Sequence, residues 1–448
     1  MNNLCVVVGS GLMVPSLLST LIPLGYQVKV AGNVESELAA LKSSFNISTV
    51  PVDVTDQSSL TSIIQGSKVV ITMVPPRFHH YVLQACITCK INLVTPSYVS
   101  NEMLSLESAA KEAGIVVLNE NGLDPGIDHM SVVVKLEEIR KLGARVLEFQ
   151  SSCGAFPAPE ACTNKLCYKL AWAPYGALLA VTRPAKYLKA GEVLEIPGVD
   201  LMKHAENYNL QFPLPLMHYP NGDSLNYPAK YGLEEAGTVV RSTLRYQNTP
   251  LISKALCALG IYNEAPRGFN NLAWSELISS LSGDELSEVG LPAGYDSDLF
   301  KKVAKKISDN ENIPMIFEAF NELGLFSDKI VQGKSIFDAF VNLVHTSLEY
   351  LPGERDCVVM EHKFLVQFES GEKKLIRSRL VEYGVPNGGT SAISRLVSIP
   401  TALAADWICN NFHEPGFMYP MEEKFSKDVL RRLENEFSVK FVEDVESV

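Results

Sequence analysis

Short apolar runs alternate with longer segments of helical periodicity over the first 125 residues. The first run, Leu4–Val8, is apolar without a break and β-branched at its end, which is typical of a parallel strand buried on both faces. Similar runs predict strands at residues 27–31, 48–52, 69–73, 91–94 and 115–118. Helical segments such as Glu102–Ala113 separate them. This alternation predicts a parallel sheet with right-handed crossovers.

A glycine turn, Gly9-Ser10-Gly11, follows the first strand, and a helical segment then runs to Gly25. A strand, a glycine turn and a helix together form a phosphate site, because backbone N–H groups and the helix dipole face the anion. The match to GxGxxG is partial, since Val14 stands in place of the third glycine. We therefore predict a doubly wound, Rossmann-type dinucleotide-binding domain with the pyrophosphate on this turn.

The residue after the second strand bears on how the adenosine ribose is recognised. An acid at this point binds the 2′-hydroxyl, whereas an arginine accepts a 2′-phosphate. Asn33 occupies the position and is neither. Its amide can bond either group without rejecting the other, so we expect NAD or NADP with modest discrimination.

The nine residues Gly122–Met130, GLDPGIDHM, follow the last of these strands. Their glycines and proline force a sharp turn that carries Asp124, Asp128 and His129. Ligands bind at the carboxyl edge of open α/β sheets. Together with Tyr98 after the preceding strand, Asp124 could serve hydride chemistry on a nicotinamide ring. The alternative is a plain strand-to-helix turn with Asp128 as a helix cap.

The pattern changes after residue 145. Further strands are expected at residues 146–152, 191–196, 239–246, 358–368 and 374–381. A Pro-rich loop is expected at residues 153–164, and apolar helices are expected at Ser391–Ile408 and Lys427–Phe437. We predict three domains: a dinucleotide-binding domain at 1–125 plus 390–448, an α/β substrate and dimerisation domain at 126–265 plus 349–389, and a helical domain at 266–348.

Composition narrows the classes of partner. The formal net charge of −12 provides no broad basic face for nucleic acid. The nine cysteines form no close framework of pairs, and Cys86 and Cys89 favour helix packing over metal or redox chemistry. No apolar stretch reaches the roughly 18–20 residues that span a membrane, and a strand-like run starts where a signal peptide would lie. We expect a cytoplasmic protein with no metal, nucleic-acid or membrane partner.

Six motifs together resemble the saccharopine dehydrogenases of the L-glutamate-forming type, also called saccharopine reductases. In order they are VVGSG, TPSYVS, GLDPGIDHM, SSCGAFPAPE, YPNGDSL and RSTLRY. The resemblance covers essentially the whole chain, and it implies a Rossmann domain, an inserted α/β domain, a small helical domain and a homodimer. The implied reaction converts saccharopine, NAD(P)+ and water into 2-aminoadipate 6-semialdehyde, glutamate and NAD(P)H, or the reverse, in lysine metabolism.

The resemblance also implies roles for individual residues. The implied catalytic residues are Tyr98, Asp124 and Cys153. The implied cofactor residues are Gly9, Ser10, Gly11, Leu12, Asn33, Asp53, Val54, Val74, Ser97, Leu123 and Pro125. The implied substrate residues are Ser97, Tyr98, Asp124, Arg241, Thr243, Leu244 and Arg245. Arginine forks suit the carboxylates of saccharopine, and a spacing of four places Arg241 and Arg245 on one strand face. A buried small residue at Cys153 and a solvated face for the arginines remain the alternatives.

Three positions depart from the family pattern. Gly222 stands where YPNRDS has an arginine, Ala171-Trp172-Ala173 lacks a family serine, and Pro15 lies one position early. Losing the arginine leaves a compensating cation such as Lys230, a different ligand, or weakened activity. The alternative functions are therefore a related amine–aldehyde reductase, such as carboxynorspermidine synthase, and a catalytically weakened dinucleotide-binding regulatory protein.

Overall fold

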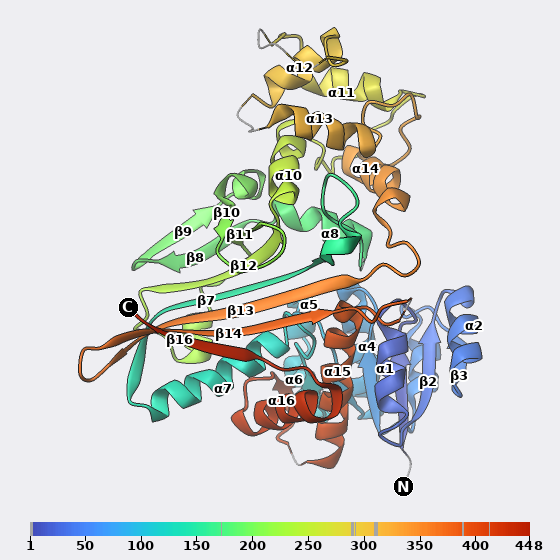
Figure 1. Cartoon of the computed structure of the whole chain (residues 1–448). Coiled ribbons are helices and arrows are strands. Elements are labelled where there is room, and N and C mark those ends of the chain that lie inside the picture. The colour runs from blue at the N-terminus through green and yellow to red at the C-terminus, as the bar shows by residue number, and fades with distance from the viewer. Residues whose placement is uncertain are drawn as a thin grey trace. The chain divides into compact units, whose positions relative to one another are not determined.

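The computed structural model describes residues 3–171, 173–287, 291, 293–308, 312–387, 389–411 and 413–448 (Figure 1). The chain forms two compact units. The first contains Met1–Ala144 and Thr390–Val442, and the second contains Arg145–Gly389 and Glu443–Val448. The first unit thus extends past residue 125 to include a helix that the sequence analysis assigned to the substrate domain.

A seven-stranded sheet forms the centre of the first unit, with the order β15-β6-β5-β4-β1-β2-β3 and parallel pairing throughout. This confirms the expected Rossmann-type sheet. Its strands β1 and β4 are apolar because they are buried on both faces. The bounds are β1 Leu4–Val8, β2 Gln27–Gly32, β3 Ser48–Pro51, β4 Val69–Thr72, β5 Asn92–Val94, β6 Val116–Leu118 and β15 Gly416–Met418.

The helices of the first unit are α1 Val14–Leu21, α2 Glu35–Ser44, α3 Gln57–Ile64, α4 His79–Cys89, α5 Asn101–Leu104, α6 Glu107–Glu112, α7 Ile127–Lys141, α15 Ala392–Asn410 and α16 Glu423–Phe437. The single helix expected at 102–113 is wrong, because the chain turns between α5 and α6 at Ser105. Helix α15 packs on α1, and α16 packs on α7. None of the nine cysteines, all of them within the described part of the chain, forms a disulfide, and Cys86 is buried within α4.

Helix α15 corrects the expectation that no apolar stretch is long enough to span a membrane. It has 19 residues and passes that test by length and composition. However, 78% of its apolar window is buried inside the protein, as in the core helix of a folded domain.

The second unit is built on a large, mostly antiparallel sheet with the order β10-β11-β12-β7-β13-β14-β16, and β8 and β9 join it beside β12. The bounds are β7 Ala144–Pro157, β8 Ala185–Lys189, β9 Glu192–Ile196, β10 Glu206–Tyr208, β11 Leu216–Pro220, β12 Thr238–Tyr246, β13 Asp356–Phe368, β14 Lys373–Tyr383 and β16 Val442–Ser447. The two late strands do join this sheet, as expected. Cys153–Pro157 continues β7 and is not part of a loop, because its backbone stays in the ladder.

The helices of the second unit are α8 Pro174–Leu179, α9 Tyr227–Tyr231, α10 Asn248–Ala258, α11 Trp274–Ser282, α12 Asp298–Lys306, α13 Ile313–Glu322 and α14 Ile336–Val344. Figure 1 shows α11 to α14 gathered together away from the sheet. Their apolar faces share one core that includes Trp274, Phe317 and Phe340. The helical segment predicted at 266–348 is therefore present, while its standing as a separate domain remains a prediction.

Candidate active site

The turn after β1 approaches the end of β4 too closely for any side chain at its first position. Gly9 has φ +119°, and a β-carbon there would lie 2.8 Å from the carbonyl carbon of Met73. The Gly9 N–H donates to Ala31 O at 2.7 Å, which ties the turn to β2 as well. Only glycine satisfies both the backbone conformation and the space.

The next two residues of the turn differ in what they face. The Ser10 hydroxyl donates to Glu37 Oε2 at 2.5 Å. A β-carbon at Gly32 would lie 2.8 Å from that hydroxyl oxygen, so the glycine at the end of β2 makes room for Ser10. A β-carbon at Gly11 would meet nothing within 4 Å, and Leu12 is exposed. The open side of Gly11 and the start of α1, which has no acid in its first turn, suit a pyrophosphate.

Hydroxyl groups of α15 bind the start of α1, directly after the Gly9–Gly11 phosphate turn, and residue Asn121, directly before GLDPG. Ser398 Oγ donates to Met13 O at 2.7 Å, and Ser394 Oγ lies 2.6 Å from Ser16 Oγ. Thr401 Oγ1 donates to Asn121 O at 2.7 Å. The late helix therefore fixes two loops that lie far from it in sequence.

The residues predicted near the adenosine lie at the carboxyl ends of β2 and β3. Asn33 follows β2 directly and is exposed. The carboxylate of Asp53, also exposed, accepts hydrogen bonds from the Thr55 N–H at 2.9 Å and from its hydroxyl at 2.8 Å, and these bonds lower the pKa of Asp53. Val54 is half-buried beside it.

A buried imidazole links the loops after β4 and β5. His79 Nε2 lies 2.8 Å from Val74 O, and Nδ1 lies 3.2 Å from Thr95 Oγ1. Burial lowers the pKa of His79 to about 4, so the ring is neutral near pH 7. A neutral ring donates from Nε2 to the Val74 carbonyl and accepts from the Thr95 hydroxyl at Nδ1. Thr95 Oγ1 in turn accepts from the Ser97 N–H at 3.2 Å. This path joins Val74 and Ser97, two predicted nicotinamide-side residues, through His79, which no sequence motif identifies.

Two predicted catalytic residues meet at the carboxyl edge of this sheet. The Tyr98 hydroxyl donates to Asp124 Oδ1 at 2.7 Å. Within residues 121–130, every residue except Asp124 is buried, including Leu123 and Pro125. The turn therefore presents one carboxylate to solvent, together with a phenol that is 39% exposed.

The other titratable groups of GLDPGIDHM support the turn. A β-carbon at Gly126, where φ is +146°, would lie 2.0 Å from Gly122 O. Asp128 is the second residue of α7 and not its N-cap, and its Oδ1 accepts from the Gly126 N–H at 2.6 Å. His129 is fully buried, with Nε2 3.1 Å from Glu120 Oε2. Both side chains are buried, whereas Asp124 is partly exposed.

All candidates of the second unit except Leu244 share one face of its sheet. Alternation along β12 places Arg241, Thr243 and Arg245 on the same side. Cys153 pairs with Thr243 in register and so lies on this side, as does Tyr219 of β11. Leu244 points to the opposite face, where it packs in an apolar cluster.

The two arginines are buried, so the alternative of a solvated strand face is wrong. Arg241 is 4% exposed, and its guanidinium lies 4.7 Å from the centre of the Tyr227 ring and donates to that phenol oxygen. Arg245 is 8% exposed, donates to Leu244 O at 2.7 Å, and lies 5.2 Å from the centre of the Tyr168 ring. Cys153 is also 8% exposed, which leaves its alternative as a buried small residue open.

One cation, Arg183, lies beside the position where the family arginine is absent. A β-carbon at Gly222 would lie 4.0 Å from Arg183 Cδ, and Arg183 is exposed. Burial raises the pKa of the Tyr219 hydroxyl, while the positive charges of Arg245 and Arg183 oppose that rise. Lys230 lies over the Tyr227 ring at 5.4 Å. Trp172 lies outside the described residues.

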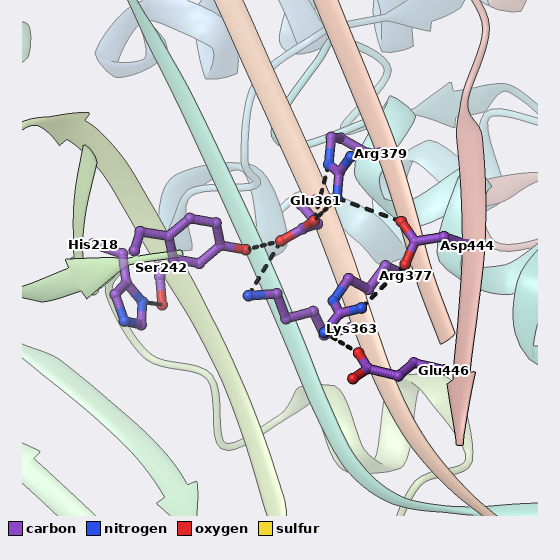
Figure 2. Close-up of polar contacts among 9 residues, drawn as sticks. His218, Ser242, Glu361, Lys363, Arg377, Arg379, Asp444 and Glu446 are labelled. Carbon is purple, nitrogen blue, oxygen red and sulfur yellow. Dashed lines mark hydrogen bonds and ion pairs between the residues drawn. The ribbon is translucent and has the colours of Figure 1, made fainter. Parts of the chain in front are cut away.

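The opposite face of this sheet carries a network with a different role. Glu361, 1% exposed, receives hydrogen bonds from Tyr208 at 2.5 Å and Arg379 at 2.9 Å and an ion pair from Lys363 at 3.2 Å (Figure 2). Arg377 and Arg379 extend it to Asp444 and Glu446 of β16. The network fastens the C-terminal strand to β14, so we assign these charges to the fold.

A parallel sheet with a glycine turn after its first strand and a phenol–carboxylate pair at the same edge defines a dinucleotide-binding oxidoreductase. The family model of the saccharopine dehydrogenase NADP binding domain matches residues 6–118. The model of the saccharopine dehydrogenase C-terminal domain matches residues 122–439. The chain belongs to the saccharopine dehydrogenase family.

Individual relatives agree over nearly the full length. The chain is 32% identical over 446 residues to a Pyricularia oryzae protein named saccharopine dehydrogenase (NADP(+), L-glutamate-forming), with 98% of each chain covered. It is 32% identical to the mitochondrial alpha-aminoadipic semialdehyde synthase of Bos taurus, matching 96% of this chain and 46% of that one, so it spans about half of that relative. The solved apo saccharopine dehydrogenase (L-Glu forming) of Saccharomyces cerevisiae has a TM-score of 0.87 at 30% identity, covering 99% of this chain and 100% of that one.

The first prediction concerns the phosphate turn. Replacing Gly11 by valine should leave folding intact, because nothing in the protein lies within 4 Å of the new β-carbon. The same branched side chain should raise the Kd for dinucleotide by about tenfold or more, since it blocks close backbone approach. Thermal unfolding and a dinucleotide titration measure the two effects, and unchanged affinity would remove Gly11 from the site.

The second prediction concerns His79 and acid stability. The folded pKa, about 4, lies below the ordinary 6.5, so the unfolded chain takes up this proton first as pH falls. The contribution to the free energy of unfolding is complete above pH 6.5 and is lost as pH falls towards 4. At 1.36 kcal/mol per pKa unit, the loss is on the order of 3 kcal/mol. Replacing His79 by glutamine should therefore flatten the dependence of urea midpoints on pH in this window, whereas the control His80→Gln should not. Parallel pH profiles for His79→Gln and the parent would contradict the assignment.

Proposed function

We propose that this chain is an NAD(P)-dependent saccharopine dehydrogenase of the L-glutamate-forming type. It interconverts saccharopine with 2-aminoadipate 6-semialdehyde and L-glutamate in lysine metabolism. The observation that carries the proposal is the Tyr98–Asp124 hydrogen bond at the carboxyl edge of the dinucleotide-binding sheet. The relative from Pyricularia oryzae, whose printed name states this activity, matches over 98% of the chain.

The chemistry needs a group that removes protons beside the point of hydride transfer. The nicotinamide dinucleotide, when bound, accepts hydride from the carbon that carries the secondary amine. Asp124 takes a proton from the ammonium form of that amine, because the carbon gives up hydride only when the nitrogen on it is neutral. Once that proton has passed to solvent, the restored carboxylate accepts a proton from the water that attacks and cleaves the imine. Tyr98 orients the carboxylate through its hydrogen bond and supplies a second protic group.

The second unit supports recognition of a polyanionic substrate. The partners described above for Arg245 are a carbonyl and an aromatic ring, and neither carries a negative charge. Among the described residues no carboxylate is paired with Arg245, and a buried guanidinium in that state favours a carboxylate ligand. This favours saccharopine over the cationic polyamine of the alternative reductase. We place Arg241, Arg245 and Thr243 among the groups that bind the substrate carboxylates.

Arg183, in the same unit, can replace the arginine that the family has at position 222. Its side chain already passes the point where a side chain at 222 would begin. Gly222 itself has φ +61°, a left-handed conformation that costs other residues free energy. We therefore favour an active enzyme with a relocated guanidinium over the catalytically weakened regulatory protein.

We also propose that the chain acts as a homodimer in the cytoplasm, binding neither nucleic acid nor membrane. The family resemblance supports the dimer, and the net charge of −12 supports the absence of nucleic acid. Light scattering on the purified chain measures the mass that tests the dimer.

The third prediction tests Asp124. Asp124→Asn keeps the size of the side chain and removes the basic carboxylate. We expect kcat for saccharopine oxidation to fall by about 10²–10⁴-fold, with little change in dinucleotide Kd. Nicotinamide absorbance measures the rate, and Asp128→Asn is a contrasting variant that should act through stability. An Asp124→Asn enzyme within twofold of the parent would exclude the carboxylate from the reaction.

The fourth prediction tests Arg183. Arg183→Ala should raise KM for saccharopine by about tenfold or more, because a substrate carboxylate loses its cation. Arg183→Lys should recover part of the loss, and dinucleotide Kd should stay unchanged. Arg267→Ala removes an exposed arginine of the helical segment and serves as the control. If Arg183→Ala and Arg267→Ala give the same KM, Arg183 does not replace the family arginine.

A further inference from the structure

The carboxyl ends of β2 and β3 are acidic. Glu35 and Glu37 lie in the first turn of α2, directly after β2. Asp53 and Asp56 follow β3 in the same way, and hydrogen bonds from Thr55 and Ser59 lower the pKa of each carboxyl. Both aspartates are therefore ionised near neutral pH. Four carboxylates thus gather where a Rossmann sheet receives the adenosine ribose.

Glu37 is held at the phosphate turn itself. Its Oε2 accepts the hydrogen bond from Ser10, which lies between the two glycines of that turn. The other carboxylate oxygen, Oε1, is left for a further donor. In dinucleotide-binding sheets an acid near the end of the second strand binds the ribose hydroxyls, beside the pyrophosphate turn. The Ser10 bond places Glu37 in that position, although it lies four residues beyond Asn33.

The basic residues of this part of the chain lie elsewhere. Between residues 30 and 67 the sequence has a single lysine or arginine, Lys42. Lys42 is in the last turn of α2, about 10 Å along the axis from Glu35 at 1.5 Å per residue. Lys29 directs its ammonium to Ile63 O, and Arg77 stacks on Phe78 after β4, on the far side of β1 from β2. Along residues 30–67, all of them described, no cation stands at the tip of β2 or β3.

From these positions we propose that the chain selects NAD(H) over NADP(H), with Glu37 accepting a hydrogen bond from the adenosine 2′-hydroxyl. The proposal rests on the dinucleotide-dependent function proposed above and names its cofactor. It departs from the fungal relative, whose name specifies NADP(+). It also replaces the modest discrimination expected from Asn33 alone.

The two cofactors differ only at the adenosine 2′ position, where NADP carries a phosphate and NAD a hydroxyl. A phosphate monoester carries about −1.5 to −2 charges near pH 7. Beside Glu37 and Glu35 it would face like charge, and residues 30–67 bring no cation there to offset that charge. Like-charge contacts are an efficient means of rejecting a wrong partner. The 2′-hydroxyl of NAD instead donates to a carboxylate, which is a charge-assisted hydrogen bond.

The test is a binding experiment on the purified full chain without saccharopine. NADH and NADPH are titrated separately, and nicotinamide fluorescence reports the Kd of each. We expect NADH to bind at least about tenfold more tightly. Glu37→Gln keeps an acceptor for Ser10 and removes the charge. It should therefore reduce the ratio of the NADPH Kd to the NADH Kd at least threefold. Glu112→Gln changes an exposed glutamate of α6 in the same unit, removes the same charge and should leave the ratio of the two Kd values unchanged.

A gain-of-function variant completes the test. Asn33→Arg combined with Glu37→Gln supplies a guanidinium and removes the acid, so NADPH should become the tighter ligand. Equal or tighter binding of NADPH by the parent chain overturns the NAD(H) proposal and leaves the enzyme class intact. Equal shifts in Glu37→Gln and Glu112→Gln overturn the role of Glu37. Failure of both dinucleotides to bind would reject the proposed function together with its cofactor.

Discussion

The neutral state of one buried imidazole determines how the cofactor-side loops are held. His79 can accept from Thr95 and donate to Val74 at the same time only while it carries a single proton. Burial enforces that state, because the imidazolium would lose its hydration in the protein interior. The bridge fixes the loops after β4 and β5, and the second of these continues into Tyr98. The position of Tyr98, and with it the Tyr98–Asp124 hydrogen bond, therefore depends on the hydrogen bonds of His79.

The sequence predicts the parts of the fold that repeat a simple pattern. Unbroken apolar runs locate the parallel strands, and glycines at positions 9 and 126 mark turns that the backbone geometry requires. The same reasoning misses β15 and β16, which are short or exposed and have no buried run. The prolines of the sequence also predict a loop at Cys153–Pro157, where the structure continues the extended strand β7.

The candidate site shows the same limit. Motifs identify Tyr98 and Asp124, but their hydrogen bond depends on the adjacency of β5 and β6. No local motif identifies His79 or Glu37, because their partners Thr95 and Ser10 are distant in sequence. The same holds for Arg183, which lies beside Gly222, a residue without a side chain. A lone histidine within a helix and a glutamate in a first helical turn have ordinary structural roles in most proteins. Their meaning here comes from the specific atoms that they contact.

The central claim is that the chain couples cleavage of saccharopine to reduction of its dinucleotide. The most direct measurement is a product balance on the purified chain with saccharopine and NAD+. The account predicts equimolar reduced dinucleotide, L-glutamate and 2-aminoadipate 6-semialdehyde, with the aldehyde trapped by an amine reagent. Dinucleotide reduction by a different amine, with no glutamate released from saccharopine under the same conditions, would contradict it.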